Sequence, residues 1–358
     1  MSRSILLALA IFIGGSVLGG DGKQATAEVL DRAWAERLEY VGIAVVEPGY
    51  HVWGSSPVVG PNGNIHLFVA RWPVSAGFNG WHTHCEIARY LSEQPEGPFY
   101  FKQVVLTGTG TSTWDKMAPH NPTVQKVGNH YALLYIANTG IGFPASQRIG
   151  MLISSRLDGP WKKVGQDGLI LSPPNDASVW SHKSTVGVNN PALLQHPDGR
   201  FFLYYKAMRQ GDVRRMGVAI AEKLEGPYAF HNPPLTSNKG QIEDGYAFVE
   251  QGKIRLLTTD NHKSAGLLWE SDNGISFGTP VLGFDRMERY IPEKEVHEAT
   301  NYRGRKFERP QVLVQQGRPT HLYIASGANI RKGDGSCSYV LRIKEAKAAN
   351  KPDAEGGL

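Results

Sequence analysis

The sequence predicts an all-β fold, a five-bladed β-propeller with four-stranded antiparallel blades. The first observation is a hairpin pattern at 188–207, in which an apolar run, a Pro-Asp-Gly turn and an aromatic-rich apolar run follow Asn189-Asn190-Pro191. The second is that this pattern occurs five times. The third is the composition, because 41 Gly, 22 Pro and 10% aromatic residues suit a chain of many turns and strands.

The repeats are long enough to be propeller blades. Equivalent positions of the five copies lie 54 to 69 residues apart, at Pro57, Pro122, Pro191, Gly245 and Pro310. In the first three copies a third apolar run leads to Gly-Pro and an aromatic residue, at 97–99, 159–161 and 226–228. A period of this length with about four strands per unit is typical of blades around a central channel. The copies predict five blades over residues 42–343.

The ring needs one more strand to close. The fifth copy ends after its third strand, at 339–343, while a spare apolar strand at 42–47 precedes the first copy. We expect residues 42–47 to complete the fifth blade, because closure removes open sheet edges. The Ala-, Lys- and Gly-rich stretch 344–358 predicts a disordered tail.

The N-terminal residues predict export. A basic lead, an apolar run from Ile5 to about Leu18 and the small residues Ala25-Thr26-Ala27 resemble a signal peptide over 1–27, with a retained membrane anchor as the alternative. We therefore expect a secreted or periplasmic protein with no stable membrane span after cleavage. The four-residue spacing of Leu30, Trp34 and Leu38 predicts a helix over 28–41 that packs on the domain or forms a homodimer contact.

Charge and cysteine content narrow the class of partner. The formal net charge of +5 is compatible with an anionic substrate, but no Lys/Arg run indicates a nucleic acid. Cys85 and Cys337 cannot by themselves build a metal cluster or a disulfide framework. Their similar contexts place them on equivalent strands, and we expect two buried thiols, although an exported chain could bridge them.

Polar pairs precede the first strand of each copy. In a propeller these positions meet at one mouth of the central channel, which is the default place for a binding site. The pairs are Ser55-Ser56, His120-Asn121, Asn189-Asn190, Glu243-Asp244 and Glu308-Arg309. Capping of strand ends explains Ser and Asn at such positions, and an ion pair of Arg309 with Glu243 or Asp244 could simply join two blades.

The repeat pattern resembles the five-bladed glycosidases. Five blades, a polar residue before Pro and an aliphatic strand ending in Gly-Pro-aromatic look like glycoside hydrolase family 43 and its relatives in families 32, 62, 68, 117 and 130. The resemblance covers residues 42–343. It implies carboxylates at three blade entrances, where this chain has Ser56, Asn121 and Asn189. Ser and Asn cannot take up a proton at neutral pH, so the family 43 chemistry is not matched.

Carboxylates occur instead in the fourth and fifth copies. Glycoside hydrolysis needs one carboxyl group on the leaving oxygen and another on water or the anomeric carbon, and a pair from Glu243, Asp244 and Glu308 could supply both. Strict alternation along a strand would let only one of Glu243 and Asp244 face the channel. His120 is a candidate acid, as the resemblance to family 117 implies.

Other polar and aromatic residues are candidates for substrate binding. Tryptophans at the funnel rim would stack on sugar faces, with packing between blades as the alternative, and His182 would suit a sulfate or carboxylate. The candidates are Trp53, Ser56, His84, Asp115, Asn121, His182, Asn190 and Arg309. We expect no cofactor and no metal ligand set, although the resemblance implies that a channel calcium or sodium ion is an option.

The sequence therefore predicts an exported exo-acting glycoside hydrolase for plant or algal oligosaccharides. Two alternatives remain. The loss of all three family 43 carboxylates favours a non-catalytic carbohydrate-binding propeller. A phosphorylase like those of family 130 would need a cluster of cations in the funnel, for which Lys206, Arg209 and His182 are the hints.

Overall fold

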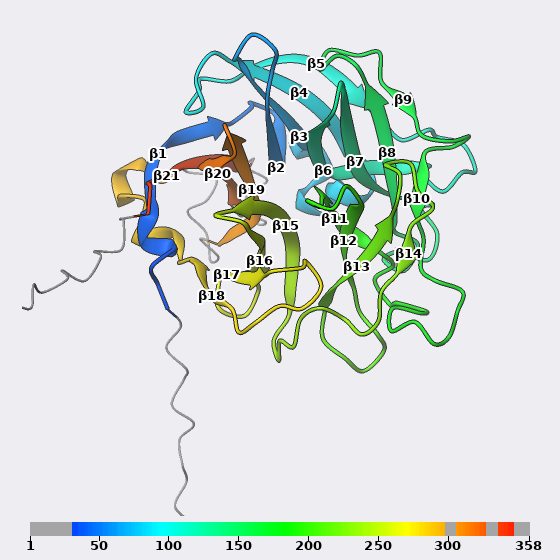
Figure 1. Ribbon diagram of the computed structural model, residues 1–358. Helices are drawn as coiled ribbons and strands as arrows, with labels where there is room; N and C mark the ends of the chain where they lie inside the picture. The colour runs from blue at the N-terminus through cyan, green and yellow to red at the C-terminus, as the bar shows by residue number, and fades with distance from the viewer. Residues whose placement is uncertain (1–30, 298–305, 327–335, 347–358) are drawn as a thin grey trace, which may run out of the picture. The chain divides into compact units, whose positions relative to one another are not determined.

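Antiparallel sheets arranged around a common axis make up the protein in the computed structural model (Figure 1). The structure describes residues 31–297, 306–326 and 336–346, which belong to one compact unit. The proposed signal peptide (1–27) and the tail from 347 onward lie outside the described residues. No helix in the described ranges is long and apolar enough to cross a membrane.

The first two blades follow one another in sequence. Blade one has the strand order β2-β3-β4-β5, and its strands are β2 (Tyr50–Val59), β3 (Ile65–Pro73), β4 (Glu86–Ser92) and β5 (Tyr100–Leu106). In blade two, both outer strands pair with β8. Its strands are β6 (Met117–Val127), β7 (His130–Asn138), β8 (Arg148–Ser154), β9 (Lys162–Lys163) and β10 (Leu169–Leu171).

Blades three and four repeat the arrangement. Blade three contains β11 (Asn189–Gln195), β12 (Phe201–Ala207), β13 (Arg215–Ala221) and β14 (Ala229–Phe230). Blade four contains β15 (Ile242–Glu250), β16 (Lys253–Asp260), β17 (Ala265–Ser271) and β18 (Val281–Phe284). The Gly-Pro-aromatic segments of the first three blades lie between the third strand and the outer strand, as the repeat pattern predicts.

An N-terminal strand completes blade five, which confirms the predicted closure. The blade contains β19 (Phe307–Gln315), β20 (Arg318–Ser326), β21 (Cys337–Ile343) and β1 (Leu38–Val45). Strand β1 pairs antiparallel with β21. The five-bladed, all-β fold class is therefore confirmed, with β1 beginning four residues earlier than the expected strand at 42–47.

The predicted helix over 28–41 is wrong for the part that the structure describes. Residues Ala35–Arg37 form a 3-10 turn, η1, and the chain continues directly into β1. Trp34 and Leu38 are buried against blades four and five, from the two ends of this 3-10 turn rather than from one face of a helix. Pairing with β21 satisfies the backbone of this segment, and a helix this short has little stability of its own. The other helical elements of the described residues are short 3-10 turns, at Val74–Ala76 (η2), Phe78–His82 (η3), Met287–Arg289 (η4) and Glu293–Glu295 (η5).

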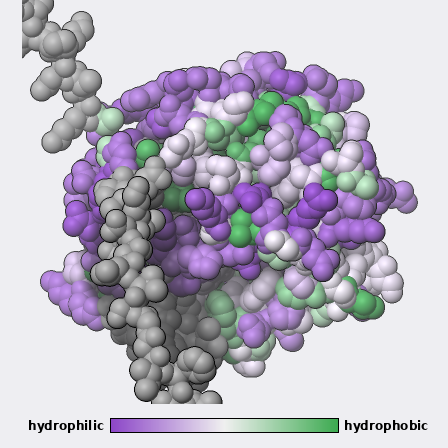
Figure 2. Space-filling model, turned by 90° about the horizontal axis from the view of Figure 1, so that it is seen from below, coloured by the Kyte–Doolittle hydropathy of each residue, from purple (hydrophilic) through white to green (hydrophobic). Residues whose placement is uncertain are grey.

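The hydrophobic core lies between neighbouring blades. One cluster joins blades one and two through residues such as Phe68 and Leu133, and another joins blades two and three through Leu134 and Leu203. Cys85, just before β4, and Cys337, at the start of β21, are buried free thiols on equivalent strands. Polar side chains cover most of the face in Figure 2, and apolar side chains gather there only in small patches.

A β-bulge of the same kind interrupts the first strand of every blade. In each case three steps along the first strand correspond to two steps along its partner, as between Trp53 and Ser56. In all five blades the first residue of the bulge, just after a residue paired with the second strand, has a positive φ between 48° and 61°. These residues are Gly54, Asn121, Asn190, Asp244 and Arg309. The five first strands surround the axis (Figure 1), so the bulges form a ring.

The bulge predicts a strong requirement for glycine at position 54. A Cβ atom there would lie 2.9 Å from Arg309 Cγ, and φ is +61°. Gly54→Ala should cost about 1–2 kcal/mol for the left-handed backbone and a further ~1–3 kcal/mol for the clash. Gly63→Ala is the matched control, because φ is +85° and no atom lies within 4 Å of its Cβ position. Urea unfolding that gives equal losses for both variants would refute this packing.

Candidate functional site

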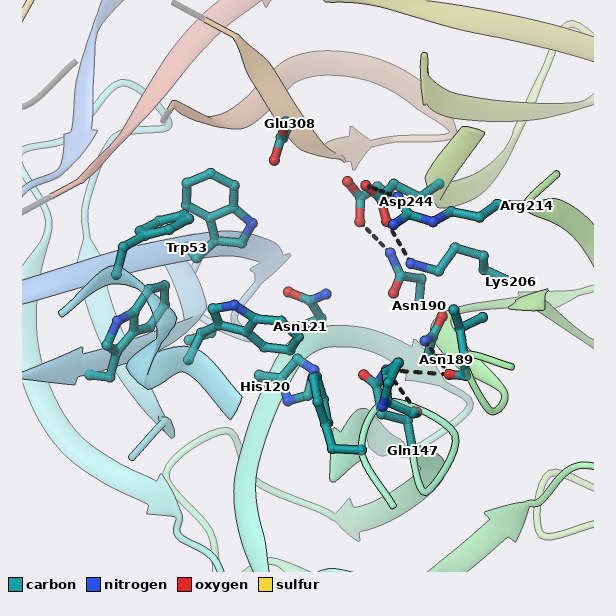
Figure 3. A pocket seen from close by; sticks show the side chains of 18 residues that line it. Trp53, His120, Asn121, Gln147, Asn189, Asn190, Lys206, Arg214, Asp244 and Glu308 are labelled. Carbon is teal, nitrogen blue, oxygen red and sulfur yellow. Dashed lines mark hydrogen bonds and ion pairs between the residues drawn. The ribbon is translucent and has the colours of Figure 1, made fainter. Parts of the chain in front are cut away.

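A cavity of about 350 Å³ opens where the five bulges meet. The residue immediately before each positive-φ position lines it, so that all five blades contribute one side chain from the same place. These residues are Trp53, His120, Asn189, Glu243 and Glu308 (Figure 3). The volume is within the range of small-molecule sites, and its position agrees with the predicted funnel.

One side of the cavity is aromatic and the other is charged. The aromatic side comes from blades one and two and consists of Trp53, Trp72, Phe78, Trp81 and Phe143. Trp53 packs edge-on against Phe78 at a centroid distance of 5.7 Å. The charged side comes from blades three to five, and Figure 3 shows Lys206, Arg214 and Asp244 across the cavity from Trp53. An apolar wall facing a few convergent polar groups is typical of sites for amphipathic ligands such as sugars.

Glu243 is held between two cations. Its Oε2 accepts from Lys206 Nζ at 2.5 Å and its Oε1 accepts from Arg214 Nη1 at 3.0 Å. Asn261 Nδ2 also donates to Oε1. Burial alone would raise the pKa of Glu243, but the charges of Lys206 and Arg214 outweigh it and lower the pKa to about 2. Glu243 is therefore an ionised, fully paired carboxylate and a weak proton acceptor.

Asp244 faces the same cavity from the next position. Because the bulge interrupts the strand, Glu243 and Asp244 both line the cavity, and the expectation that only one could do so is wrong. Asn190 Nδ2 donates to Asp244 Oδ1, and the Arg309 backbone N–H donates to Oδ2 at 3.2 Å. Burial and the neighbouring charge of Glu243 raise the pKa of Asp244 despite the opposing charge of Arg309.

Glu308 has no hydrogen-bond or ion-pair partner among the described residues. Burial, followed by the charges of Glu243 and Asp244, raises the pKa of Glu308 to about 8. Figure 3 shows the Glu308 side chain apart from the other charged groups, with no hydrogen bond or ion pair drawn to it. At neutral pH this carboxyl group carries a proton that it can donate to a ligand.

His120 is neutral and oriented. Its Nδ1 donates to the Ala118 carbonyl oxygen at 2.7 Å, and its ring packs edge-on against Trp81 at 5.1 Å. Burial lowers the pKa of His120 to about 4. A neutral ring whose N–H is bound to a carbonyl cannot donate a second proton at neutral pH, so the prediction of His120 as the acid conflicts with this geometry. Its Nε2 can accept a hydrogen bond instead.

Arg309 is buried at the axis and does not line the cavity. Its Nη2 donates to the Asn121 carbonyl oxygen at 2.9 Å and to Thr123 Oγ1 at 3.1 Å, and its Nη1 lies 3.9 Å from Asp244 Oδ1. Arg309 therefore joins blades, the alternative that its position in the sequence also predicts, instead of lining the substrate cavity. Asn121 and Asn190 both line the cavity as predicted.

The residues at the axis do not fit a channel calcium or sodium ion. The described part of the chain contains no group of three or more His, Cys, Asp and Glu side chains that could hold a metal. The fully buried guanidinium of Arg309 lies beside Asp244 instead. A metal ion would have to share this space with a fixed positive charge.

Two predicted binding residues are structural. Ser56 Oγ accepts from the Val124 backbone N–H at 2.9 Å and so links blade one to blade two. Aligning the repeats on Pro57 predicts Ser55-Ser56 as the funnel pair of blade one. The bulge lies two residues earlier, so the funnel pair is Trp53-Gly54. Asp115 is buried away from the cavity and accepts from Lys163 Nζ at 2.5 Å.

The two remaining histidines also lie outside the cavity. His182 is not among the lining residues, and its Nδ1 donates to the Pro174 carbonyl oxygen at 2.8 Å. His84 is exposed beside a different pocket and its Nδ1 lies 2.8 Å from Thr83 Oγ1. Both came from loops, whose course the repeat pattern does not determine.

Several lining residues were not predicted as site residues. Asn189, named earlier as part of a blade-entrance pair, comes from the first strand β11. The others come from second strands and from loops between strands, and they are Ala70, Trp72, Phe78, Trp81, Phe143, Pro144, Gln147, Val186, Lys206 and Arg214. Lys206, which the sequence suggested only as a cation for the phosphorylase alternative, pairs directly with Asn189 in the hairpin register. No sequence signal placed Phe143 or Arg214. The side-chain Oδ1 of Asn189 is buried without a hydrogen-bond partner in the described structure, which leaves an acceptor beside the cavity.

Comparisons with known proteins agree with the fold. No family model matches the chain. It is 27% identical over 188 residues to extracellular endo-α-(1→5)-L-arabinanase 2 of Bacillus subtilis (strain 168), a match that covers 49% of this chain and 38% of the arabinanase. An extracellular endo-α-(1→5)-L-arabinanase of Thermotoga petrophila is 25% identical over 163 residues, which cover 41% of this chain and 32% of that protein. The matched part thus spans about a third of the length of these curated relatives.

Solved structures of glycoside hydrolases share the architecture. Zg3597, a family 117 glycoside hydrolase of Zobellia galactanivorans, has a TM-score of 0.65 at 15% identity, covering 87% of this chain and 92% of that one. The GH43_1 enzyme of Xanthomonas citri, complexed with xylotriose, has a TM-score of 0.57 at 14% identity and the same coverage. The predicted resemblance to the five-bladed glycosidases of families 43 and 117 is therefore confirmed at the level of the fold.

The raised pKa of Glu308 predicts a pH-dependent effect on stability. Between about pH 4.5 and pH 8 the folded protein keeps a proton on Glu308 that the unfolded chain releases, so stability falls as the pH rises through this window. Glu308→Gln abolishes this loss, and one pKa unit corresponds to about 1.4 kcal/mol. The melting temperature of the variant should match that of the wild type at pH 4 and exceed it at pH 8. Glu93→Gln, in an exposed turn, should show no such divergence.

Proposed function

We propose that the chain is an exported glycoside hydrolase that removes a terminal sugar from plant or algal oligosaccharides. The observation that carries this proposal is Glu308, a carboxyl group that stays protonated at neutral pH in a cavity shared by all five blades. The arabinanase relatives are named as extracellular enzymes, and the neighbouring folds belong to glycoside hydrolases, which supports both parts of the proposal.

The proposed chemistry uses two carboxyl groups. Glu308 donates its proton to the glycosidic oxygen as the bond from that oxygen to the anomeric carbon breaks. Asp244 takes a proton from the water molecule that adds to the anomeric carbon. The raised pKa of Asp244 makes it a better proton acceptor than an ordinary aspartate, while Asn190 and Arg309 stabilise its ionised form.

Glu243 acts on the pair through its charge. Paired with Lys206 and Arg214, it stays ionised, and its negative charge raises the pKa of both Asp244 and Glu308. This separates the three carboxyl groups into a proton donor, a proton acceptor and a fixed charge. Different environments for neighbouring carboxyl groups are the usual basis of such a division of roles.

The shape of the cavity supports action at a chain end. Its lining comes from all five blades, and the aromatic side offers indole faces on which a single sugar ring can stack. Asn189 Oδ1 and His120 Nε2 can accept hydrogen bonds from sugar hydroxyl groups.

One observation favours a second candidate, the non-catalytic carbohydrate-binding propeller. Glu243 and Asp244 both have protein partners, so two of the three carboxyl groups also have a structural use. A phosphorylase has less support, because only Lys206 of the three predicted phosphate-binding residues lines the cavity, where it binds Glu243, while Arg209 and His182 lie elsewhere.

Activity assays on a panel of oligosaccharides distinguish these candidates. For a substrate that the wild type cleaves, Glu308→Gln should lower kcat/KM by about 10²–10⁴-fold, the usual contribution of acid–base catalysis. The same variant should keep far more activity on a 2,4-dinitrophenyl glycoside, whose leaving group needs no proton. Asp244→Asn should lose activity on both substrates.

Glu93→Gln should retain wild-type activity, since it lies in an exposed turn between β4 and β5. Full activity of Glu308→Gln on oligosaccharides would refute the proposed acid. Binding without turnover by the wild type on every member of the panel would favour the binding propeller.

A further inference from the structure

Two cations and three carboxyl groups line the cavity. The cations are Lys206 and Arg214, and the carboxyl groups are those of Glu243, Asp244 and Glu308. Glu308 keeps its proton at neutral pH, so Lys206 and Arg214 face at most two ionised carboxylates. Arg309 at the axis, beside Asp244, adds a further positive charge. Cations in a cleft attract ligands of the opposite sign.

Arg214 is the cation best placed to bind an anionic ligand in the cavity. Its side chain is 33% exposed, whereas that of Lys206 is 8% exposed. Only Nη1 is engaged among the described residues, through its bond of 3.0 Å to Glu243. The Nε and Nη2 groups of the same planar fork stay available to a ligand in the cavity, and such a fork matches the oxygens of a carboxylate or sulfate.

The backbone of Arg214 is fixed, so the fork is presented in a defined place. Gln241 Oε1 accepts from the Arg214 backbone N–H at 2.9 Å, and Asn238 Nδ2 donates to its carbonyl oxygen at 2.9 Å. Glu243 holds the side chain from the cavity side. An arginine restrained at three points needs little further ordering to bind an anion.

Arg214 also lies across the cavity from the aromatic wall. Figure 3 shows it on the side opposite Trp53, with the open centre between them. A sugar ring stacked on the indoles would direct a substituent toward the guanidinium. We propose that the terminal sugar bound in this funnel carries an acidic group, a carboxylate or a sulfate ester, that Arg214 binds. This rests on the proposed function, because it names the substrate class of the same cavity.

Matched pairs of sugars test the proposal by binding alone. The probes are galacturonate, glucuronate, mannuronate and guluronate with their methyl esters, and the 6-sulfates of galactose and glucose with the unmodified sugars. Trp53, Trp72 and Trp81 line the cavity, so binding can be followed by tryptophan fluorescence and checked by calorimetry. We expect at least one acidic probe to bind about tenfold or more tighter than its neutral partner. The uronates and the sulfates show which anion the site takes.

Variants locate the preference at Arg214. Arg214→Gln should abolish the difference between the acidic probe and its neutral partner, whereas Arg200→Gln, at an exposed turn of blade three, should keep it. Arg214→Lys keeps the charge but loses the fork, and should retain only part of the difference. Added salt should weaken the binding of the acidic probe by the wild type and leave the neutral partner unaffected.

The contrary results are separate from those of the hydrolase proposal. Equal affinity for acidic and neutral partners throughout the panel, or a preference that persists in Arg214→Gln, would overturn the assignment of an acidic sugar. Neither result depends on turnover. Conversely, an active Glu308→Gln enzyme would refute the proposed acid while leaving a preference for acidic sugars intact.

Discussion

The closed ring depends on one buried guanidinium at its axis. Arg309 of blade five bonds to the backbone of Asn121 in blade two, lies beside Asp244 of blade four, and packs its aliphatic part against Gly54 of blade one. Asn190 of blade three donates to the same Asp244. All five blades therefore meet in one buried network. A buried charge is costly unless it is paired and hydrogen-bonded. Nη2 of Arg309 has two acceptors, whereas its Nε and Nη1 have no hydrogen-bond partner in the described structure, so the nearby charge of Asp244 is what compensates the guanidinium.

The same bulges that allow this network also build the cavity. In blades two, three and four the left-handed residue lets two consecutive side chains line the cavity, as with Glu243 and Asp244. Lys206 and Arg214 hold Glu243 ionised, and the charge of Glu243 raises the pKa of Asp244 and Glu308. Glu308 has no hydrogen-bond or ion-pair partner among the described residues, and the charges of Lys306 and Lys206 offset the rise only in part. A carboxyl group left uncompensated in this way costs stability and supplies a proton, which is typical of catalytic sites.

The fold could be predicted because the same pattern of apolar runs and turns occurs five times in the sequence. Each hairpin supplies its own pattern of turn and apolar residues, and five weak signals at one period predict blades, closure by the N-terminal strand and the position of the funnel. The site was predicted only in part. Glu243, Asp244 and Glu308 were found by their place before the repeated Pro or Gly, but Ser56 was misplaced because the bulge of blade one is at Gly54 rather than beside Pro57. Arg214 and Phe143 come from loops, whose paths depend on contacts with other blades that no local pattern encodes.

In the proposed reaction Glu308 donates the proton in the funnel. The pH dependence of kcat/KM tests this role of Glu308 most directly. For a substrate cleaved by the wild type, kcat/KM should fall above about pH 8, where Glu308 loses its proton. The residual activity of Glu308→Gln should show no such fall, because the amide does not titrate. A decline near pH 8 that persists unchanged in Glu308→Gln, or a wild-type rate that keeps rising through that pH, would contradict the assignment.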